Sequence, residues 1–207
     1  MLHLSKEGAM IRTPQALIPY IFALAAVLGG LVWHVGEEMQ LGRVVSTGTA
    51  SIGGPFALLD QNGRTYTDKN LKGHWSLIYF GYTHCPDVCP ITLELMSDAM
   101  GRLGARASAV TPVFITIDPG RDTPPAMKQY VAAFGKNFVG LTGNDAQVAH
   151  VLREYHVYAK KRPLKGGDYG MDHSGAIYLM DPNGKFVTDY EEVTDPQKIA
   201  DDIKKRF

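Results

Sequence analysis

Two cysteines with three residues between them lie in the stretch GYTHCPDVCP, which runs from Gly81 to Pro90. They are the only cysteines among 207 residues, too few for the disulfide framework that stabilises small secreted domains. A domain of this size buries enough apolar surface to fold without one. We therefore expect Cys85 and Cys89 to do chemistry, as a redox couple or as ligands of a soft metal such as copper. The remaining alternative, a structural disulfide, gains little across so short a loop.

The segments beside this motif indicate how the thiols are held. Residues 75–82, WSLIYFGY, form the continuous apolar run of a buried central strand. The chain from Pro86 to Gly101 has apolar residues at helical spacing and predicts a helix with Pro86 at its first position. Cys85 is then expected at the helix N-terminus, where the dipole stabilises a thiolate, with Cys89 one turn later on the same face.

A buried strand that runs into a cysteine motif and then a helix is the thioredoxin-like arrangement. The rest of the domain alternates between strands and helices, which predicts a largely parallel α/β sheet with an antiparallel edge. We expect strands at 110–118, 138–143 and 156–161, helices at 124–134, 145–155 and from 195 onward, hairpins around 62–63 and 181–184, and a solvated, mobile loop at 161–170.

A useful copper site needs a third ligand, and His173 is the best placed of the seven histidines. It precedes the expected strand 176–180, in the loop that lies beside the cysteine motif in a thioredoxin-like fold. That loop usually carries a cis-proline, and Asp172, His173 and Ser174 take its place here. Asp172 is expected to orient the imidazole from the second coordination sphere. His84 and Met171 are the alternative ligands.

The N-terminus is expected to lie outside the folded domain. Residues 16–35, ALIPYIFALAAVLGGLVWHV, contain no Lys, Arg, Asp or Glu, and twenty helical residues rise about 30 Å, the thickness of a bilayer's hydrocarbon core. A cleaved signal peptide normally has a shorter apolar region. We expect a cytoplasmic N-terminal segment at 1–15, a transmembrane anchor at 16–35, a linker at 36–54 and a thioredoxin-like copper-binding domain at 55–207.

The distribution of charged residues indicates how the span is oriented in the membrane, and the overall charge argues against one class of partner. Lys6 and Arg12 precede the span and Arg43 follows it, which favours a cytoplasmic N-terminus. The first 15 residues are too short and too poor in Ser and Arg for an organelle transit peptide, so we expect a single-pass protein of a bacterial inner membrane whose soluble domain faces the periplasm. The balance of 21 Lys and Arg against 21 Asp and Glu argues against a nucleic-acid partner.

Three motifs together resemble the Sco/SenC family: FGYTHCPDVCP at 80–90, ITIDPGRDTP at 115–124 and DHSGAIYLMDPNG at 172–184. The resemblance implies a membrane-anchored copper metallochaperone that assists assembly of cytochrome c oxidase. It implies one copper per chain, held by the two motif cysteines and the late histidine, here Cys85, Cys89 and His173. It further implies delivery to the CuA centre, so that the CuA-bearing oxidase subunit is the partner.

The residues also leave open which copper state and which function are used. Two sulfurs and one nitrogen suit Cu(I) and can hold Cu(II). We do not expect a copper chaperone to be an enzyme, but the question stays open, because the alternative function is that of a thiol–disulfide oxidoreductase in which Cys85 and Cys89 reduce the CuA cysteines. Such exchangers usually carry C-x-x-C, whereas this chain carries C-x-x-x-C. A thioredoxin-fold peroxidase would leave both the cysteine pair and His173 unexplained.

For the second motif we expect a structural role. Asp118 ends a predicted strand, and Asp122 or Thr123 is placed to cap the helix that follows.

Overall fold

The computed structural model describes residues 25–28 and 51–207. Residues 25–28 are helical with exposed side chains; the rest of the expected anchor, the segment 1–15 and the linker up to residue 50 lie outside the described residues. Within the described ranges, no helix combines the length and the apolar character needed to cross a membrane. The chain from Ala50 to Phe207 folds as a unit of its own.

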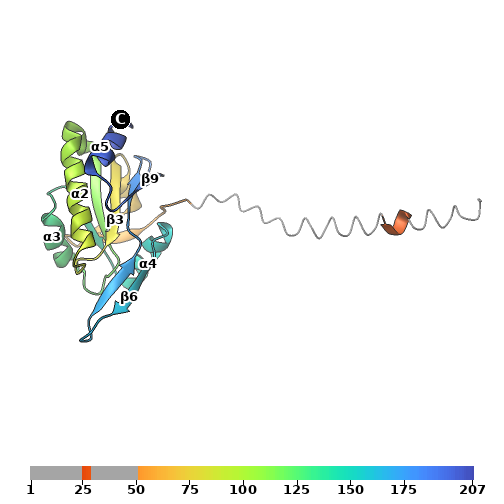
Figure 1. Ribbon diagram of the computed structural model, residues 1–207, viewed down its shortest axis with the longest axis horizontal. Coiled ribbons are helices and arrows are strands. Elements are labelled where there is room, and N and C mark those ends of the chain that lie inside the picture. The colour runs from red at the N-terminus through yellow and green to blue at the C-terminus, as the bar shows by residue number, and fades with distance from the viewer. Residues whose placement is uncertain (1–24, 29–50) are drawn as a thin grey trace, which may run out of the picture. The chain divides into compact units, whose positions relative to one another are not determined.

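This unit alternates between strands and helices (Figure 1). In chain order its elements are β1 Ala57–Asp60, β2 Thr65–Thr67, the 3-10 helix η2 Asp68–Leu71, β3 Trp75–Gly81, α2 Val88–Leu103, the 3-10 helix η3 Gly104–Ala109, β4 Val110–Thr116, α3 Pro124–Ala132, β5 Val139–Thr142, α4 Asp145–Glu154, β6 Ala159–Pro163, β7 Tyr169–His173, β8 Ala176–Met180, β9 Phe186–Glu191 and α5 Pro196–Lys204.

The main sheet has the order β2-β1-β5-β4-β3-β8-β9. Its centre is parallel, since β4 pairs in parallel with both β3 and β5. Every other pairing in this sheet is antiparallel, so the expectation of a largely parallel sheet is wrong. Two of these four pairings, β1–β2 and β8–β9, are hairpins, and a short turn can join only antiparallel strands. The other two attach these hairpins to the parallel centre, through β5 and β3.

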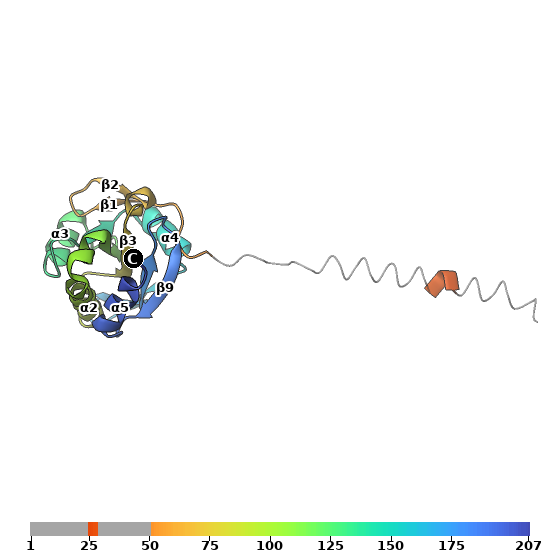
Figure 2. The same ribbon diagram turned by 90° about the horizontal axis from the view of Figure 1, so that it is seen from above.

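Strand β3 is covered on both faces, as a central strand should be. The Tyr79 hydroxyl lies 3.9 Å from Sγ of Cys89 on α2. Its neighbour Phe80 faces the other side, where its ring centre lies 5.2 Å from that of Tyr155, just after α4. Figure 2 shows α2 and α5 packed together on one side of β3 and α4 on the other.

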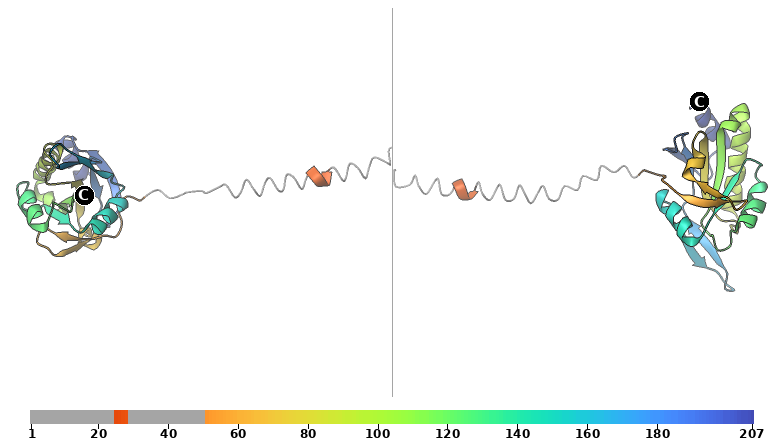
Figure 3. Two further views of the ribbon diagram at one scale, coloured as in Figure 1. Left: turned by 90° about the horizontal axis from the view of Figure 1, so that it is seen from below. Right: turned by 180° about the vertical axis from the view of Figure 1, so that it is seen from behind.

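Half of the segment expected to be a loop at 161–170 lies in strands of a β-hairpin, and residues 164–168 form the loop that joins these strands. Strands β6 and β7 form a two-stranded sheet of their own, with Arg162 opposite Gly170 and Ala159 opposite His173. This hairpin extends away from the main sheet (Figures 1 and 3). Because nearly all of β6, AKKRP, is exposed, it lacks the apolar alternation that marks a half-buried strand in a sequence.

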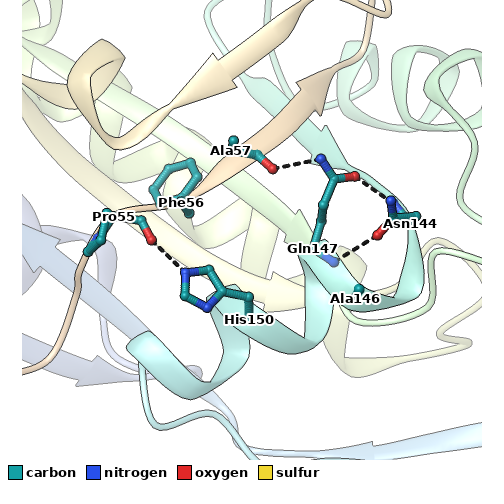
Figure 4. Close-up of a pocket in the computed structure, with 7 residues that line it drawn as sticks. All are labelled: Pro55, Phe56, Ala57, Asn144, Ala146, Gln147 and His150. Atoms are coloured by element: carbon teal, nitrogen blue, oxygen red, sulfur yellow. Dashed lines mark hydrogen bonds between the residues drawn. The ribbon is translucent and has the colours of Figure 1, made fainter.

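The chain enters the unit alongside α4 (Figure 4). Gln147 donates a side-chain hydrogen bond to the carbonyl of Ala57 at 3.0 Å, and Nε2 of His150 lies 2.9 Å from the carbonyl oxygen of Pro55. Asn144 and Gln147 cap the start of α4 reciprocally. An open pocket lies between these two segments, and neither cysteine lines it.

Candidate metal centre

Several segments meet at one end of the main sheet. Because β3 and β4 are parallel, the loops after them, which contain Cys85 and Asp122, leave the sheet at the same end. Strand β8 is antiparallel to β3, so the chain from His173 into β8 arrives at this end as well. Strand β9 is antiparallel to β8 and ends here, next to Glu192. The topology therefore gathers residues that are up to about a hundred positions apart in the sequence.

Helix α2 begins at Val88, two residues later than predicted. The physical reason is Pro90, which has no N–H and whose ring would clash with the carbonyl of Pro86 in a helix that began there. With the start at Val88, Pro90 falls in the first turn, where backbone N–H groups have no helical acceptor. Cys85 thus lies in the turn before the helix and Cys89 in its first turn, so the expectation of a shared helical face is wrong.

The two sulfurs differ in exposure. Cys89 is fully buried, whereas Cys85 is partly exposed, and both are free thiols. The backbone N–H of Cys89, at the start of α2, lies 3.4 Å from Sγ of Cys85 and donates to it. Gly81 makes room for the buried sulfur, since a Cβ at this position would lie 2.8 Å from Sγ of Cys89. Such a contact is closer than van der Waals packing allows.

The two thiols also differ in acidity. A hydrogen bond from the Cys89 thiol, helped by bonds from His173 and from the backbone of Asp87 and Cys89, lowers the pKa of Cys85 to about 3 against the cost of burial. The same bond to Cys85, together with burial, raises the pKa of Cys89 well above that of an ordinary thiol. The pair therefore holds one proton on Cys89 and a thiolate on Cys85.

His173 ends strand β7 and faces the sulfurs. Its Nε2 lies 3.8 Å from Sγ of Cys89, and its Nδ1 lies 2.9 Å from the carbonyl oxygen of Ser174, to which it donates. This bond leaves Nε2 for a metal. Burial alone would lower the pKa of His173, but hydrogen bonds to Cys85 and to Ser174 raise it. The rings of Tyr79 and Tyr82 meet the imidazole edge-on.

The donor set fits copper. Among the described residues, no three or more His, Cys, Asp and Glu side chains already form a closed metal cage. However, the 3.8 Å between Sγ of Cys89 and Nε2 of His173 matches the separation, about 3.8 Å, of two ligands at a trigonal angle with bonds of ~2.3 Å and ~2.0–2.1 Å, as in zinc sites. The partly exposed Cys85 adds a second soft sulfur. Two sulfurs and one imidazole suit copper.

Asp172 does not orient the imidazole, so that expectation is wrong. Its carboxylate lies 3.0 Å from Nε of Arg162, across the hairpin, and the carbonyl of Ser174 holds the His173 ring instead. The physical reason is the strand geometry of β7, in which successive side chains point to opposite faces. Met171, the alternative ligand in this strand, packs partly buried against the core.

Asp122 fixes the loop that carries the cysteine motif. It is fully buried, and its carboxylate accepts hydrogen bonds from the N–H of Thr83 at 3.1 Å, the hydroxyl of Thr83 at 2.6 Å and the hydroxyl of Thr116 at 2.6 Å. Nδ1 of His84 lies 3.8 Å from the same carboxylate. Thr123 is the N-cap residue of α3, as predicted, but makes no side-chain cap bond. The Asp122 side chain therefore holds the loop of the cysteine motif in place, and it does not cap helix α3.

Asp118 and Arg121 tie the same loop to the β6–β7 hairpin. Arg121 pairs with the buried Asp118, and its guanidinium lies 3.8 Å above the ring centre of Tyr169 and donates to the Tyr169 carbonyl at 3.0 Å. The Tyr169 hydroxyl donates to Asp118 at 2.8 Å. The motif DPGRDTP therefore contacts both the loop that carries the cysteines and the hairpin that carries His173. Two acids and an arginine directly after a buried strand were the sequence pattern that could have revealed this.

Comparisons with known proteins identify the family. The SCO1/SenC family model matches residues 44–207. The mitochondrial SCO1 homolog 1 of Arabidopsis thaliana is 41% identical over 199 residues, which are 90% of this chain and 60% of that protein. The SCO2-like protein of Rickettsia felis is 42% identical over 193 residues, 91% of this chain and 93% of its own. The chain thus spans less than two thirds of the Arabidopsis protein.

Solved structures share the mixed α/β, thioredoxin-like fold. The structure of Bradyrhizobium japonicum ScoI with copper bound has a TM-score of 0.72 and 50% identity, and covers 76% of this chain and 100% of that one. BsSco, described as a member of the Sco family of cytochrome c oxidase assembly proteins with a disulfide switch, has a TM-score of 0.60 and 27% identity, with 74% and 91% covered. Because the family model spans all three motifs and most of the sequence, the chain belongs to the SCO1/SenC family.

Proposed function

We propose that this protein is a copper chaperone that holds one copper through Cys85, Cys89 and His173 and delivers it to the CuA centre of cytochrome c oxidase during assembly. The observation that carries the proposal is the convergence of Cys89 with both Cys85 and His173 at one end of the sheet. The copper-bound structure of the Bradyrhizobium relative supports the choice of metal. The oxidase as target is supported by the description of BsSco.

The geometry is suited to a metal that must leave again. Cys85 is partly exposed and deprotonated, so it can receive copper from a donor and be the first ligand that an incoming sulfur of the target replaces. Cys89 and His173 lie deeper and keep the metal while this exchange proceeds. The direction of transfer then depends on the relative affinity of the two proteins for copper.

We also propose that the chain is anchored in a bacterial inner membrane by residues 16–35, with the copper-binding domain in the periplasm. The uncharged span and the excess of Lys and Arg before it support this placement. The Rickettsia relative supports a bacterial source. Protease added to spheroplasts should digest residues 51–207, and protection of this domain beside digested periplasmic controls would show that the orientation is wrong.

The experiment on the site is metal analysis of the purified, reduced chain. We expect about one copper per chain in the wild type and a sharp loss in Cys85→Ser, Cys89→Ser and His173→Ala, because three ligands leave no redundancy. His84→Ala is the matched control, since His84 adjoins Cys85 but its ring faces Asp122; this variant should keep its copper. Full copper binding by His173→Ala would remove His173 from the site.

Thiol–disulfide exchange is the second candidate function. It is favoured by the inequality of the thiols: a partly exposed Cys85 with a pKa of about 3 is suited to attack, and the adjacent Cys89 to resolve the mixed disulfide. The two functions separate at His173, because metal binding needs its nitrogen whereas exchange needs only the sulfurs. Reduction of a CuA-type disulfide that survives in His173→Ala would support the oxidoreductase.

A further inference from the structure

Two residues outside the three motifs, Tyr79 and Glu192, meet behind Cys89. Tyr79 is a fully buried residue of β3, and its hydroxyl lies between two acceptors. One is Sγ of Cys89, at 3.9 Å, and the other is Oε2 of Glu192, at 3.3 Å. A carboxylate therefore reaches the more deeply buried sulfur of the candidate centre through one phenol.

The position of Glu192 is fixed by its surroundings. Its backbone carbonyl lies 3.3 Å from the hydroxyl of Thr92, a fully buried residue of α2. Its carboxylate occupies the space beside Gly175, where a Cβ would overlap the carboxylate atoms. Gly175 is two residues after His173. Glu192 is therefore held both against α2, the helix that carries Cys89, and against the segment that follows His173.

When copper is bound, Cys89 has lost its proton, and the tyrosine hydroxyl then has one proton to donate, whereas a carboxylate and a thiolate only accept. The proton of Tyr79 must therefore be divided between Glu192 and Cys89. We propose that Glu192, acting through Tyr79, limits the hydrogen bond that Cys89 receives and so makes the two sulfur ligands of a bound copper unequal. This inference rests on the proposed function, because it needs a copper held by Cys89.

The effect falls on one sulfur only. Sγ of Cys85 accepts the backbone N–H of Cys89, and that bond does not involve Tyr79 or Glu192. A hydrogen bond donated to a ligand sulfur withdraws electron density from the metal bond, and such bonds tune copper–cysteine sites. By keeping the phenol proton, Glu192 leaves Cys89 the stronger electron donor. In this arrangement Tyr79 touches the ligand and Glu192 is a positioning residue.

The test uses the full chain loaded with Cu(II) and records the sulfur-to-copper charge-transfer absorption. Tyr79→Phe removes the hydroxyl and keeps the ring, so the band should move to longer wavelength. Glu192→Gln replaces a carboxylate by a weaker acceptor and releases the phenol proton to sulfur, so the band should move to shorter wavelength and copper should be lost several-fold faster to a chelator. In the double variant, the Glu192→Gln change should have no effect of its own.

Tyr130→Phe is the matched control. Its hydroxyl is buried near the cysteines and has no hydrogen-bond partner among residues 25–28 and 51–207, so its removal should leave the band in place. A Glu192→Gln shift of equal size with and without Tyr79 means that the carboxylate acts through its charge alone, which overturns the inference. Unchanged bands in all copper-loaded variants overturn it as well. If the wild type binds no copper, the proposed function fails and this inference with it.

Discussion

The two arms of the candidate centre are built in different ways. The cysteine arm joins β3 to α2, so it continues directly from the most buried strand of the sheet, and Asp122 holds its loop from inside the core. The histidine arm is the β6–β7 hairpin, which pairs with no strand of the main sheet and exposes most of β6. Its attachment to the rest of the unit includes the contacts of Arg121 with Tyr169.

This contrast indicates which of the two arms opens more readily. Segments that share the core open only with a free energy near that of global unfolding, whereas segments with few buried apolar contacts open locally at much lower cost. We therefore expect the histidine arm to open while the cysteine arm stays folded. Opening of this kind changes the distance between His173 and the sulfur of Cys89 and leaves the two sulfurs in place relative to each other.

Asp122→Asn tests the cysteine arm and should have the largest effect. An amide nitrogen cannot accept the bonds now made by Thr83 and Thr116, so the free energy of unfolding should fall by about 1–3 kcal/mol. Urea unfolding measures this change, and metal analysis should show weaker copper binding. Asp145→Asn, at an exposed aspartate on α4, is the control. Equal stability of the two variants would mean that the cysteine arm does not depend on its buried acid.

Thiol alkylation between pH 5 and pH 8 compares the two sulfurs of the cysteine arm. With a pKa of about 3, Cys85 is a thiolate throughout this range and loses that charge only as pH falls toward 3, so its rate should stay nearly constant. An ordinary thiol at pH 5 is almost entirely protonated, and even after the lower nucleophilicity of an acidic thiolate is allowed for, Cys85 should react about tenfold faster.

Mass analysis of the labelled apo chain separates this rate from that of Cys89, whose pKa is raised and which should stay unlabelled at pH 5. The largest cause of the low pKa is the hydrogen bond from Cys89, on the same arm. The alkylation rate of Cys85 should therefore stay nearly the same if the hairpin opens. A rate that climbs steeply from pH 5 to pH 8 would contradict the assignment of the thiolate to Cys85.

Arg121→Lys tests the histidine arm with a smaller expected effect. Lysine keeps the charge beside Asp118 but loses the planar stacking on Tyr169. Hydrogen exchange at the amides of β6 and β7 should accelerate, while exchange in β3 should not change. Copper affinity should fall by about tenfold, as for other contacts that orient a ligand. Faster exchange in both regions would mean that the arms open together.

Arg162→Ala should have the smallest effect. The Arg162–Asp172 pair lies on the hairpin surface, with the two side chains 58% and 51% exposed, and exposed pairs of this kind contribute about 0–1 kcal/mol. Copper affinity and hairpin exchange should remain close to those of the wild type. A loss as large as that of Arg121→Lys would show that this surface pair holds the hairpin as strongly as Arg121 does.

The sequence predicted the cysteine arm better than the histidine arm. The structure confirms the strand at the apolar run 75–82, the hairpins β1–β2 and β8–β9, and the strand expected at 110–118, which as β4 ends two residues earlier. Apolar runs and Asn-Gly turns are local patterns that a sequence shows directly. The strand expected at 156–161 overlaps β6, but the pairing of β6 with β7 is not predicted, because the exposed residues around the turn give no apolar alternation. The helix start was misplaced because the proline at position 90 outweighs the one at position 86.

The sequence predicts which residues of the site lie close together, but it does not predict how their side chains are oriented. The motif and the strand order brought Cys85, Cys89 and His173 together as expected; their binding of metal stays a prediction. The choice of the Ser174 carbonyl over Asp172 depends on the side-chain directions of β7, which the sequence does not specify. Glu192 is reached only through three-dimensional contacts, and no local pattern marks it.

The missing side chain of Gly81 affects how the core is packed around Cys89. The sulfur of Cys89 fills the space that any side chain at position 81 would need, between Phe114 and Tyr79. The buried sulfur of Cys89 is thus also a packing atom of the hydrophobic interior, where densities resemble those of molecular crystals. A single methyl group added at position 81, which provides no ligand, would displace the sulfur, so the packing of the interior and the geometry of the candidate centre depend on the same atom.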